Sequence, residues 1–356
     1  MKIRKKPKKN KQSCTSCCTT PKKWYQERLF ITVIILSILL FISYITPELK
    51  SFYQSFMSYL NMMWLPISVG FLIGGVIDYF IPKEYIQHYL SRTRKRTVLY
   101  AVMFGFLMTA CCHGILAIGI ELYHKGASTS AIVAFFLASP WANLPITILL
   151  FGFFGWNALF IVVSAIIIAI NTGLIFQILE RKGLVECKHC ELGGDKPENN
   201  NFSITTDIKQ RITEFNFNRD TIFVATKGTL SGSWRLTKMV LWWILIGMSM
   251  ASLIRYIPQH IFHQYMGPTL LGLFITLLFA TIIEVCSEGT SPVAFEIYNQ
   301  TGAFGNSFTF LMAGVATDFT EIGLIWNNIG RKAALFMPLI SIPQILFLAY
   351  LFNVFL

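Results

Sequence analysis

Long apolar stretches separated by short polar segments run along most of the chain. The first covers residues 29–46, and eight more approach the roughly 20 residues that an α-helix needs to cross a bilayer. These eight lie at about residues 63–81, 98–120, 127–154, 158–179, 239–256, 270–285, 302–325 and 333–356. The pattern predicts an all-α polytopic membrane protein.

The chain also resembles itself at an offset of 175 residues. At this offset cysteine, glycine, acidic and tyrosine positions coincide, which chance rarely produces among polar residues. The matched pairs include Cys111 with Cys286, Gly114 with Gly289, Glu121 with Glu296, and Tyr123 with Tyr298. Asn143 falls on Asp318. We therefore predict two homologous halves, as in many secondary transporters.

Loop charge predicts that the two halves are inverted. The loop at 82–96 carries five Lys and Arg, whereas its counterpart at 257–269 carries none, so one is expected in the cytoplasm and the other outside. Inversion requires an odd number of crossings in each half. The third stretch of each half is interrupted, at 139–143 and at 314–318, and we predict broken, re-entrant helices there. Nine full crossings are the alternative.

The first stretch is predicted to be an anchor helix outside the repeats. Residues 1–28 hold ten Lys and Arg against one acid, and no small-residue cleavage site follows residues 29–46, which argues against a signal peptide. The predicted order of parts starts with a basic cytoplasmic tail and the extra N-terminal helix with its connector, followed by a first repeat, a polar cytoplasmic linker and a second repeat. Their residues are 1–28, 29–60, 61–180, 181–236 and 237–356.

Composition agrees with a lipid environment. Hydrophobic residues make up 54% of the chain and charged residues 13%, against about 25% charge in a soluble domain. The net charge of +12 is concentrated in blocks beside apolar stretches, which is typical of a topology signal rather than of nucleic-acid binding. We expect a multi-pass protein of a prokaryotic cytoplasmic membrane that contacts the lipid bilayer and no nucleic acid. Its oligomeric state, a homo-oligomer included, stays open.

Thiol and ionisable side chains interrupt two of the apolar stretches. Such groups are costly inside a bilayer and therefore predict a site. If the repeats pack symmetrically, the two interruptions meet near the midplane. The expected solute-binding residues are Cys111, Cys112, His113, Cys286, Ser139, Asn143 and Thr290. The expected carriers of a coupling proton or cation are Glu284, Glu288 and Asp318.

Thiolates are soft ligands that favour copper(I), zinc and, by the same reasoning, trivalent arsenic. Two further thiol clusters lie in the polar segments, and each supplies half of a tetrahedral zinc site. Their members are Cys14, Cys17, Cys18, Cys187 and Cys190. They could hold a metal, pass a solute to the pore, or stay as unstructured reduced cysteines. Because the sequence has no Walker P-loop, HExxH, Gly-x-Ser-x-Gly or dinucleotide fingerprint, we expect neither an enzyme nor a cofactor.

At these interruptions the chain resembles the predicted-permease family that includes the organoarsenical efflux permeases, called ArsP. The likeness rests in the first half on Cys112-His113-Gly114, 125–128 and 134–143, and in the second on Glu284, Cys286, 287–290, 310–314 and 316–318. It covers residues 63–356 and implies efflux of trivalent organoarsenicals such as methylarsenite, with membrane cysteines as ligands. His113 stands where many relatives have a thiol, and Asp318 where they often have Asn.

The leading hypothesis is a permease that exports a thiophilic solute, trivalent organoarsenicals first. A permease for a transition-metal cation such as copper or zinc is the alternative, favoured by the three acidic positions. A membrane redox or metal-sensing protein is the third reading, and it would use the thiol clusters of the polar segments.

Overall fold

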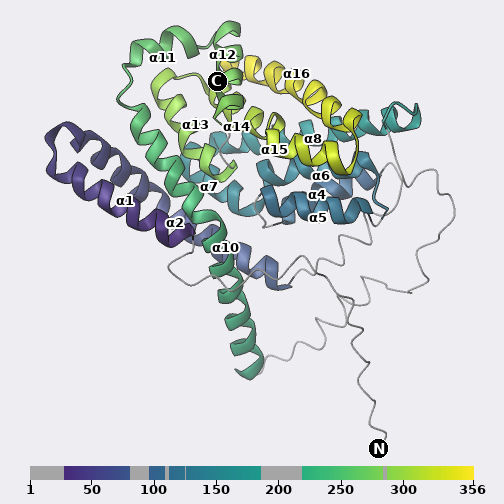
Figure 1. Ribbon diagram of the computed structural model, residues 1–356, viewed down its shortest axis with the longest axis horizontal. Helices are drawn as coiled ribbons and strands as arrows, with labels where there is room; N and C mark the ends of the chain where they lie inside the picture. Colours follow the sequence, from purple (N-terminus) through teal and green to yellow (C-terminus); the bar gives the residue numbers. More distant parts are fainter. Residues whose placement is uncertain (1–27, 81–95, 109–111, 125, 186–218, 284–286) are drawn as a thin grey trace, which may run out of the picture.

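The computed structural model describes residues 28–80, 96–108, 112–124, 126–185, 219–283 and 287–356. Throughout these ranges the chain is helical, and none of them contains a strand. An all-helical fold is what the spacing of the apolar stretches predicts, so the fold class is confirmed. Figure 1 shows the helices gathered into one bundle, from which α1 and α2 project together on one side.

The N-terminal anchor helix is confirmed as α1 (Arg28–Ile45). Its side chains are mostly exposed, Phe41 by 66%, as expected of a helix that faces lipid. A short 3-10 helix, η2 (Pro47–Leu49), leads into α2 (Lys50–Phe80). This helix begins well before the apolar stretch predicted at residue 63, because Phe52, Phe56 and Tyr59 already bury one helix face.

The helices of the two halves follow one another in matching order. The first half continues with α4 (Arg96–Leu107), α5 (Cys112–His124), α6 (Thr129–Ala142), α7 (Leu144–Phe154), η3 (Gly155–Asn157) and α8 (Ala158–Arg181). The second contains α10 (Arg219–Ile254), α11 (Gln259–Met266), α12 (Leu270–Ile282), α13 (Ser287–Thr301), α14 (Phe304–Ala316), α15 (Phe319–Asn328) and α16 (Arg331–Phe355). The starts of α5, α6 and α7 recur 175 residues later as those of α13, α14 and α15. The repeat and its inversion stay predictions that these boundaries support.

Within the described ranges six helices are long and apolar enough to span a membrane, or seven if the bent pair α11 and α12 counts as one span. That pair bends by 106° around Gly267 and Pro268, where proline cannot continue a helix. The third stretch of each half is broken as predicted, at Asn143 and at Thr317–Asp318. Since α14 and α15 together qualify as one span, the re-entrant course stays a prediction.

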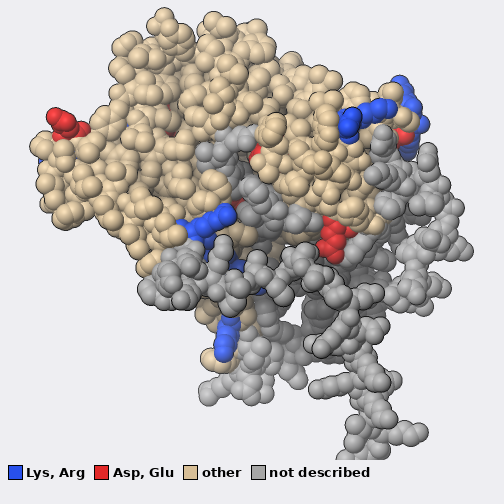
Figure 2. All heavy atoms as spheres, viewed as in Figure 1, with Lys and Arg blue, Asp and Glu red and all other residues tan. Residues whose placement is uncertain are grey.

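Part of the predicted linker is helical. The linker is predicted at 181–236, and α10 begins at Arg219, so the last third of that range belongs to a helix. A long apolar helix that follows removes the nucleation cost for these turns, which contain no proline. Figure 1 shows this part of α10 projecting from the bundle. Figure 2 shows basic side chains on the projecting part and near the end of α8, with a broad uncharged surface elsewhere.

Helices α6 and α14 form the centre of the two halves. All residues of α6 are buried, and α6 packs against α4, α5 and α8, while α14 packs against α12, α13 and α16. Both N-termini are capped by the last helix of their own half. The carboxylate of Glu180 accepts hydrogen bonds from the backbone N–H and the hydroxyl of Ser130, at 2.9 and 2.8 Å. Oδ1 of Asn353 accepts from the N–H of Gly305 at 2.7 Å. Such caps satisfy donors that the first helical turn leaves free.

Candidate solute site between α2, α7, α10 and α13

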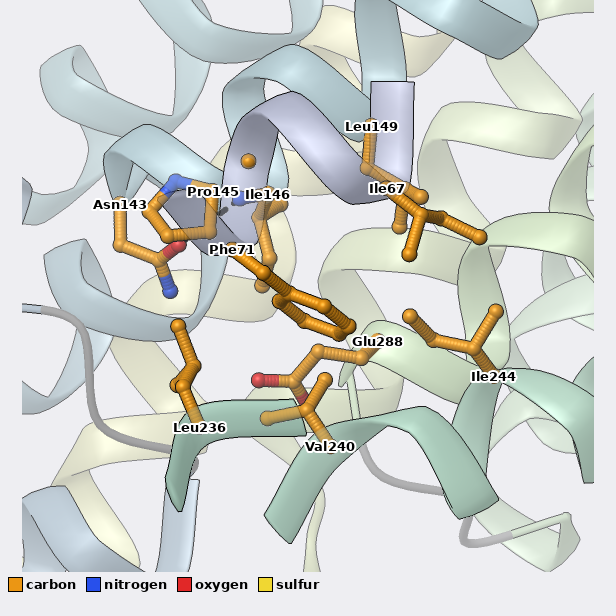
Figure 3. A pocket seen from close by; sticks show the side chains of 11 residues that line it. Ile67, Phe71, Asn143, Pro145, Ile146, Leu149, Leu236, Val240, Ile244 and Glu288 are labelled. Carbon is orange, nitrogen blue, oxygen red and sulfur yellow. Dashed lines mark hydrogen bonds between the residues drawn. The ribbon is translucent and has the colours of Figure 1, made fainter. Parts of the chain in front are cut away.

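A small cavity lies where four helices of the two halves meet (Figure 3). Its volume is about 20 Å³, which is room for about one water molecule. Its lining is Ile67, Gly70 and Phe71 of α2; Asn143, Pro145, Ile146 and Leu149 at α7; Leu236, Val240 and Ile244 of α10; and Glu288 of α13. Two of these side chains are polar, and the rest form an apolar wall.

Glu288 supplies the charge of this cavity. It lies in the first turn of α13 and is only 5% exposed. A carboxylate is favoured at a helix N-terminus, where unpaired backbone N–H groups carry partial positive charge. Figure 3 shows its carboxylate among Phe71, Leu236 and Val240, and the residue also has an interaction partner of its own. An ionisable group so deep in a membrane protein is a candidate for function.

Asn143 is the second polar residue of the cavity, and it also caps the helix that begins after the break between α6 and α7. Its Oδ1 accepts a hydrogen bond from the N–H of Ile146 at 2.9 Å, which caps α7. Its Nδ2 donates to the carbonyl of Ser139 at 2.9 Å. Figure 3 places Asn143 across the cavity from Glu288. The structure therefore brings two of the predicted site residues, from different halves, to one cavity.

The other described candidates lie outside this lining. The hydroxyl of Ser139 donates to the carbonyl of Gly105 at 3.1 Å and ties α6 to α4. Thr290 is buried on α13, two residues beyond Glu288. Asp318 caps α15 by accepting hydrogen bonds from the N–H groups of Thr320 and Glu321, at 2.7 and 3.2 Å. The structure thus gives Asp318 a local role in capping, and its role in coupling stays a prediction.

The thiols fall largely outside the described residues. Cys111, Glu284 and Cys286 lie there, as do the members of the two thiol clusters of the polar segments, Cys14, Cys17, Cys18, Cys187 and Cys190. Cys112 and His113 begin α5, but their side chains are not described. In the part of the chain that the structure describes, no group of three His, Cys, Asp or Glu side chains could hold a metal ion. The meeting of Cys112 with Cys286 therefore stays a prediction.

Glycines let the four helices close tightly around the cavity. A Cβ added at Gly247 of α10 would lie 2.0 Å from the carbonyl oxygen of Gly289 on α13, so only a hydrogen atom fits there. A Cβ at Gly70 of α2 would lie 3.3 Å from the carbonyl oxygen of Pro145. Because backbone contacts of this kind leave no room for a guest, a solute larger than water requires the helices to separate.

A buried polar cluster nearby escaped the sequence reasoning. Glu296 is fully buried, accepts a hydrogen bond from the hydroxyl of Tyr59 and forms an ion pair with Arg255, whose Nε lies 3.1 Å from Oε1. Glu296 entered the sequence comparison only as the counterpart of Glu121. The sequence does contain a signal for an ion pair here. Glu296 interrupts a helix that has no basic residue of its own, and Arg255 lies at the end of an apolar stretch.

Comparison with known proteins agrees with a membrane transport protein. A family model described as a predicted permease, ArsP, matches residues 48–354. A Streptococcus mutans protein, predicted by its name to be a subunit of a two-component membrane permease complex, is 20% identical over 75% of this chain and 83% of its own length. The UPF0718 protein MJ0584 of Methanocaldococcus jannaschii is 22% identical over 82% of this chain and 92% of its own. The UPF0718 protein YcgR of Bacillus subtilis is 32% identical over 26% of this chain and 33% of its own. No solved structure matches significantly.

Proposed function

The chain belongs to the ArsP predicted-permease family, and from this premise we propose that it exports a thiophilic solute, trivalent organoarsenicals first. The observation that carries the proposal is the cavity shared by Asn143 and Glu288. Glu288 follows Cys286 by two residues in the sequence, which makes the thiol of Cys286 a candidate ligand for a solute at this cavity. Apolar walls, two polar groups and a neighbouring thiol suit a small organic molecule with one soft atom.

The chemistry of such a solute matches these groups one by one. Methylarsenite carries a methyl group, which the apolar wall accommodates, and two hydroxyl groups, which can bond to the amide and the carboxylate. A cysteine thiol replaces one hydroxyl at arsenic: the As–S bond forms, the As–O bond breaks, and the thiol proton leaves with the hydroxyl as water. Water reverses the exchange on release. Glu288 can accept and return the proton during each exchange.

Release limits how tightly the solute can be held. A closed cage of three thiolates would retain arsenic, whereas a permease has to let it go. Successive single contacts with Cys112 and Cys286 are therefore the mechanism that we propose. The cavity of about 20 Å³ corresponds to a closed state, because methylarsenite is several times larger than a water molecule. Loading and release then require the halves to rock against each other.

Uptake by everted membrane vesicles tests this function. Vesicles with the wild-type chain should accumulate methylarsenite, and Cys286→Ala should abolish the accumulation. Glu288→Gln keeps the shape of the side chain and should lower the rate at least tenfold, a typical effect of losing an acid–base group. Ser37→Ala, on the exposed face of the anchor helix α1, is the control and should export normally. Normal uptake by Cys286→Ala would refute the role of the thiol as a ligand.

A transition-metal cation is the second candidate, since a buried carboxylate such as Glu288 also neutralises a positive charge. The same vesicles decide between the two. Accumulation of zinc or copper(I) without methylarsenite would assign the cavity to a metal cation. Equal behaviour of wild type and Glu288→Gln toward the metals would exclude that alternative.

A further inference from the structure

A buried polar cluster joins α2, α10 and α13 on one side of the cavity. In this cluster, which we call the Glu296 cluster, the carboxylate of Glu296 on α13 is the centre. The hydroxyl of Tyr59 on α2 donates to Oε2, and Nε2 of Gln300 donates to Oε1 at 2.8 Å. Arg255, just beyond α10, places Nε at 3.1 Å from the same Oε1. Its Nη1 donates to the hydroxyl of Ser55 at 3.3 Å.

These bonds fall into two classes. Those of Arg255 and Gln300 to Glu296 stay within the second half. Two hydrogen bonds cross to α2: the bond from Tyr59 to Glu296 and the bond from Arg255 to Ser55. The guanidinium of Arg255 also lies 5.3 Å from the ring centroid of Tyr59, at cation–π distance. A separation of α2 from α10 and α13 therefore breaks two hydrogen bonds and one cation–π contact of the cluster, and beside it the bond that the N–H of Phe52 donates to the hydroxyl of Tyr256 at 3.1 Å.

The cluster lies on the same side of the cavity along all three helices. On α2, Tyr59 is eight residues from Ile67, and on α13, Glu296 is eight residues from Glu288. At 1.5 Å per residue each separation is about 12 Å. On α10, Arg255 lies eleven residues beyond Ile244 in the same direction, or about 16 Å. Three helices that line the cavity are thus tied together at a level about two to three helical turns to one side of it.

Buried side chains lie between the two levels. Met63 of α2 and Met248 and Ala251 of α10 are fully buried there. Tyr59 also packs its ring edge against Phe295 of α13. Buried residues of all three helices, the polar Ser252, Thr290 and Ser291 among them, therefore lie between the cavity and the Glu296 cluster.

Stability alone does not account for an ion pair at this depth. Well-packed apolar residues of similar volume stabilise a helix bundle as well as a buried ion pair does, and often better. Polar bonds have one property that an apolar contact lacks: once broken, each partner can be solvated by water that enters an opened path. The side chain of Arg255 is already 36% exposed, whereas that of Glu296 is 1% exposed, so the cluster reaches from the interior to the surface.

We propose that the Glu296 cluster is the gate of the permease on the outer side of the membrane. The gate is closed in this structure, and it opens when Tyr59 and Ser55 of α2 part from Glu296 and Arg255. The side follows from the absence of basic residues in the loop 257–269 that Arg255 adjoins. The proposal rests on the permease function, and the identity of the solute plays no part in it.

Accessibility of the cavity from the two sides of the membrane tests the gate. Ile67→Cys places a thiol in the cavity, and a membrane-impermeant maleimide applied to intact cells labels it from outside. The rate at that position is read by peptide mass spectrometry, which separates it from the native cysteines. Tyr59→Phe removes a crossing bond, and Glu296→Gln removes the charge that strengthens the bonds from Tyr59 and Arg255. Each should raise the outside labelling rate about fivefold. The closed state then loses, relative to the open state, the net free energy of about one hydrogen bond.

Two matched substitutions control for the chemistry of the change. Tyr44→Phe removes a hydroxyl from a lipid-exposed ring, and Glu48→Gln removes an exposed charge from the connector between α1 and α2. Both should leave the labelling rate of the cavity thiol unchanged. In everted vesicles, where the reagent meets the cytoplasmic side, the gate variants should not label faster than the parent.

Two results would overturn the gate. One is an unchanged outside labelling rate in Tyr59→Phe. This substitution preserves the aromatic ring, so it still tests the gate if Glu296→Gln fails to fold. The other is an equal rise from both sides, which would show general loosening. Because labelling needs no solute, failure of methylarsenite export with a positive labelling result would overturn only the proposed solute.

Discussion

Gly247 makes a backbone contact between α10 and α13 that leaves no room for a larger residue. A Cβ at this position would lie 2.0 Å from the carbonyl oxygen of Gly289, 2.8 Å from its carbonyl carbon and 2.9 Å from its Cα. Ordinary contact begins near 3.4 Å, so the helices would have to separate by about 1.4 Å. Overpacking of this kind costs about 1–3 kcal/mol, because the opposing atoms are backbone and cannot move aside.

We therefore predict that Gly247→Ala lowers the melting temperature of the purified protein by about 2–12 °C, at roughly 2–4 °C per kcal/mol. Gly323→Ala is the matched control, since no atom lies within 4 Å of a Cβ added there in α15. It should leave the melting temperature unchanged or raise it, because alanine favours a helix by about 0.5–1 kcal/mol over glycine. Thermal unfolding followed by size-exclusion chromatography measures both. An unchanged melting temperature in Gly247→Ala would refute the close approach of α10 and α13.

Two further predictions concern the helix N-termini. Asn143→Ala removes the cap of α7 and should destabilise the protein by about 0.5–2 kcal/mol in thermal unfolding, whereas Asn143→Ser supplies another capping oxygen without a charge and should recover most of that loss. A loss as large in Asn143→Ser would contradict the capping role. Glu180→Gln retains one acceptor for Ser130 and should cost about 1 kcal/mol, while Glu180→Ala leaves both donors of Ser130 without the carboxylate and should cost about 1–3 kcal/mol in the same assay. Equal melting temperatures for the two Glu180 variants and wild type would contradict the cap of α6.

Apolar periodicity predicted the helical fold, the anchor helix and the interruptions of the paired stretches, because each of these depends on residues that are neighbours in the sequence. Asn143 and Glu288 were also found from sequence, since polar residues inside apolar stretches are conspicuous. The cavity that they share could not be derived in this way. It depends on how α2 and α10 pack, and helix packing is decided by side chains and glycines that are far apart in the chain.

The Glu296 cluster shows the same limit more sharply. Tyr59, Arg255 and Glu296 come from three helices, and about 200 residues separate Tyr59 from Arg255. Each residue has an ordinary reading in isolation: a tyrosine on a helix face, an arginine at a helix end and a glutamate near a loop. Only their meeting in the folded chain makes one of them a fully buried carboxylate with an opposite charge 3.1 Å away.

The polar residues at the helix breaks have to be judged by two requirements at once. Asn143 and Asp318 lie at matching positions, and both accept backbone hydrogen bonds that begin the next helix. A break inside a membrane protein needs such a cap with or without a solute, because unpaired N–H groups are costly in a bilayer. Capping alone would be served equally well by Asn or Asp at either position. At position 143 the amide also donates from Nδ2 to the carbonyl of Ser139, which an ionised carboxylate cannot do, so Asn143→Asp changes the fold as well as the charge. Asn143→Ser keeps a capping oxygen and adds no charge, and it is for this reason the informative change at the cavity. A Ser variant that unfolds close to wild type but no longer exports would separate the role of Asn143 in transport from its role in the fold.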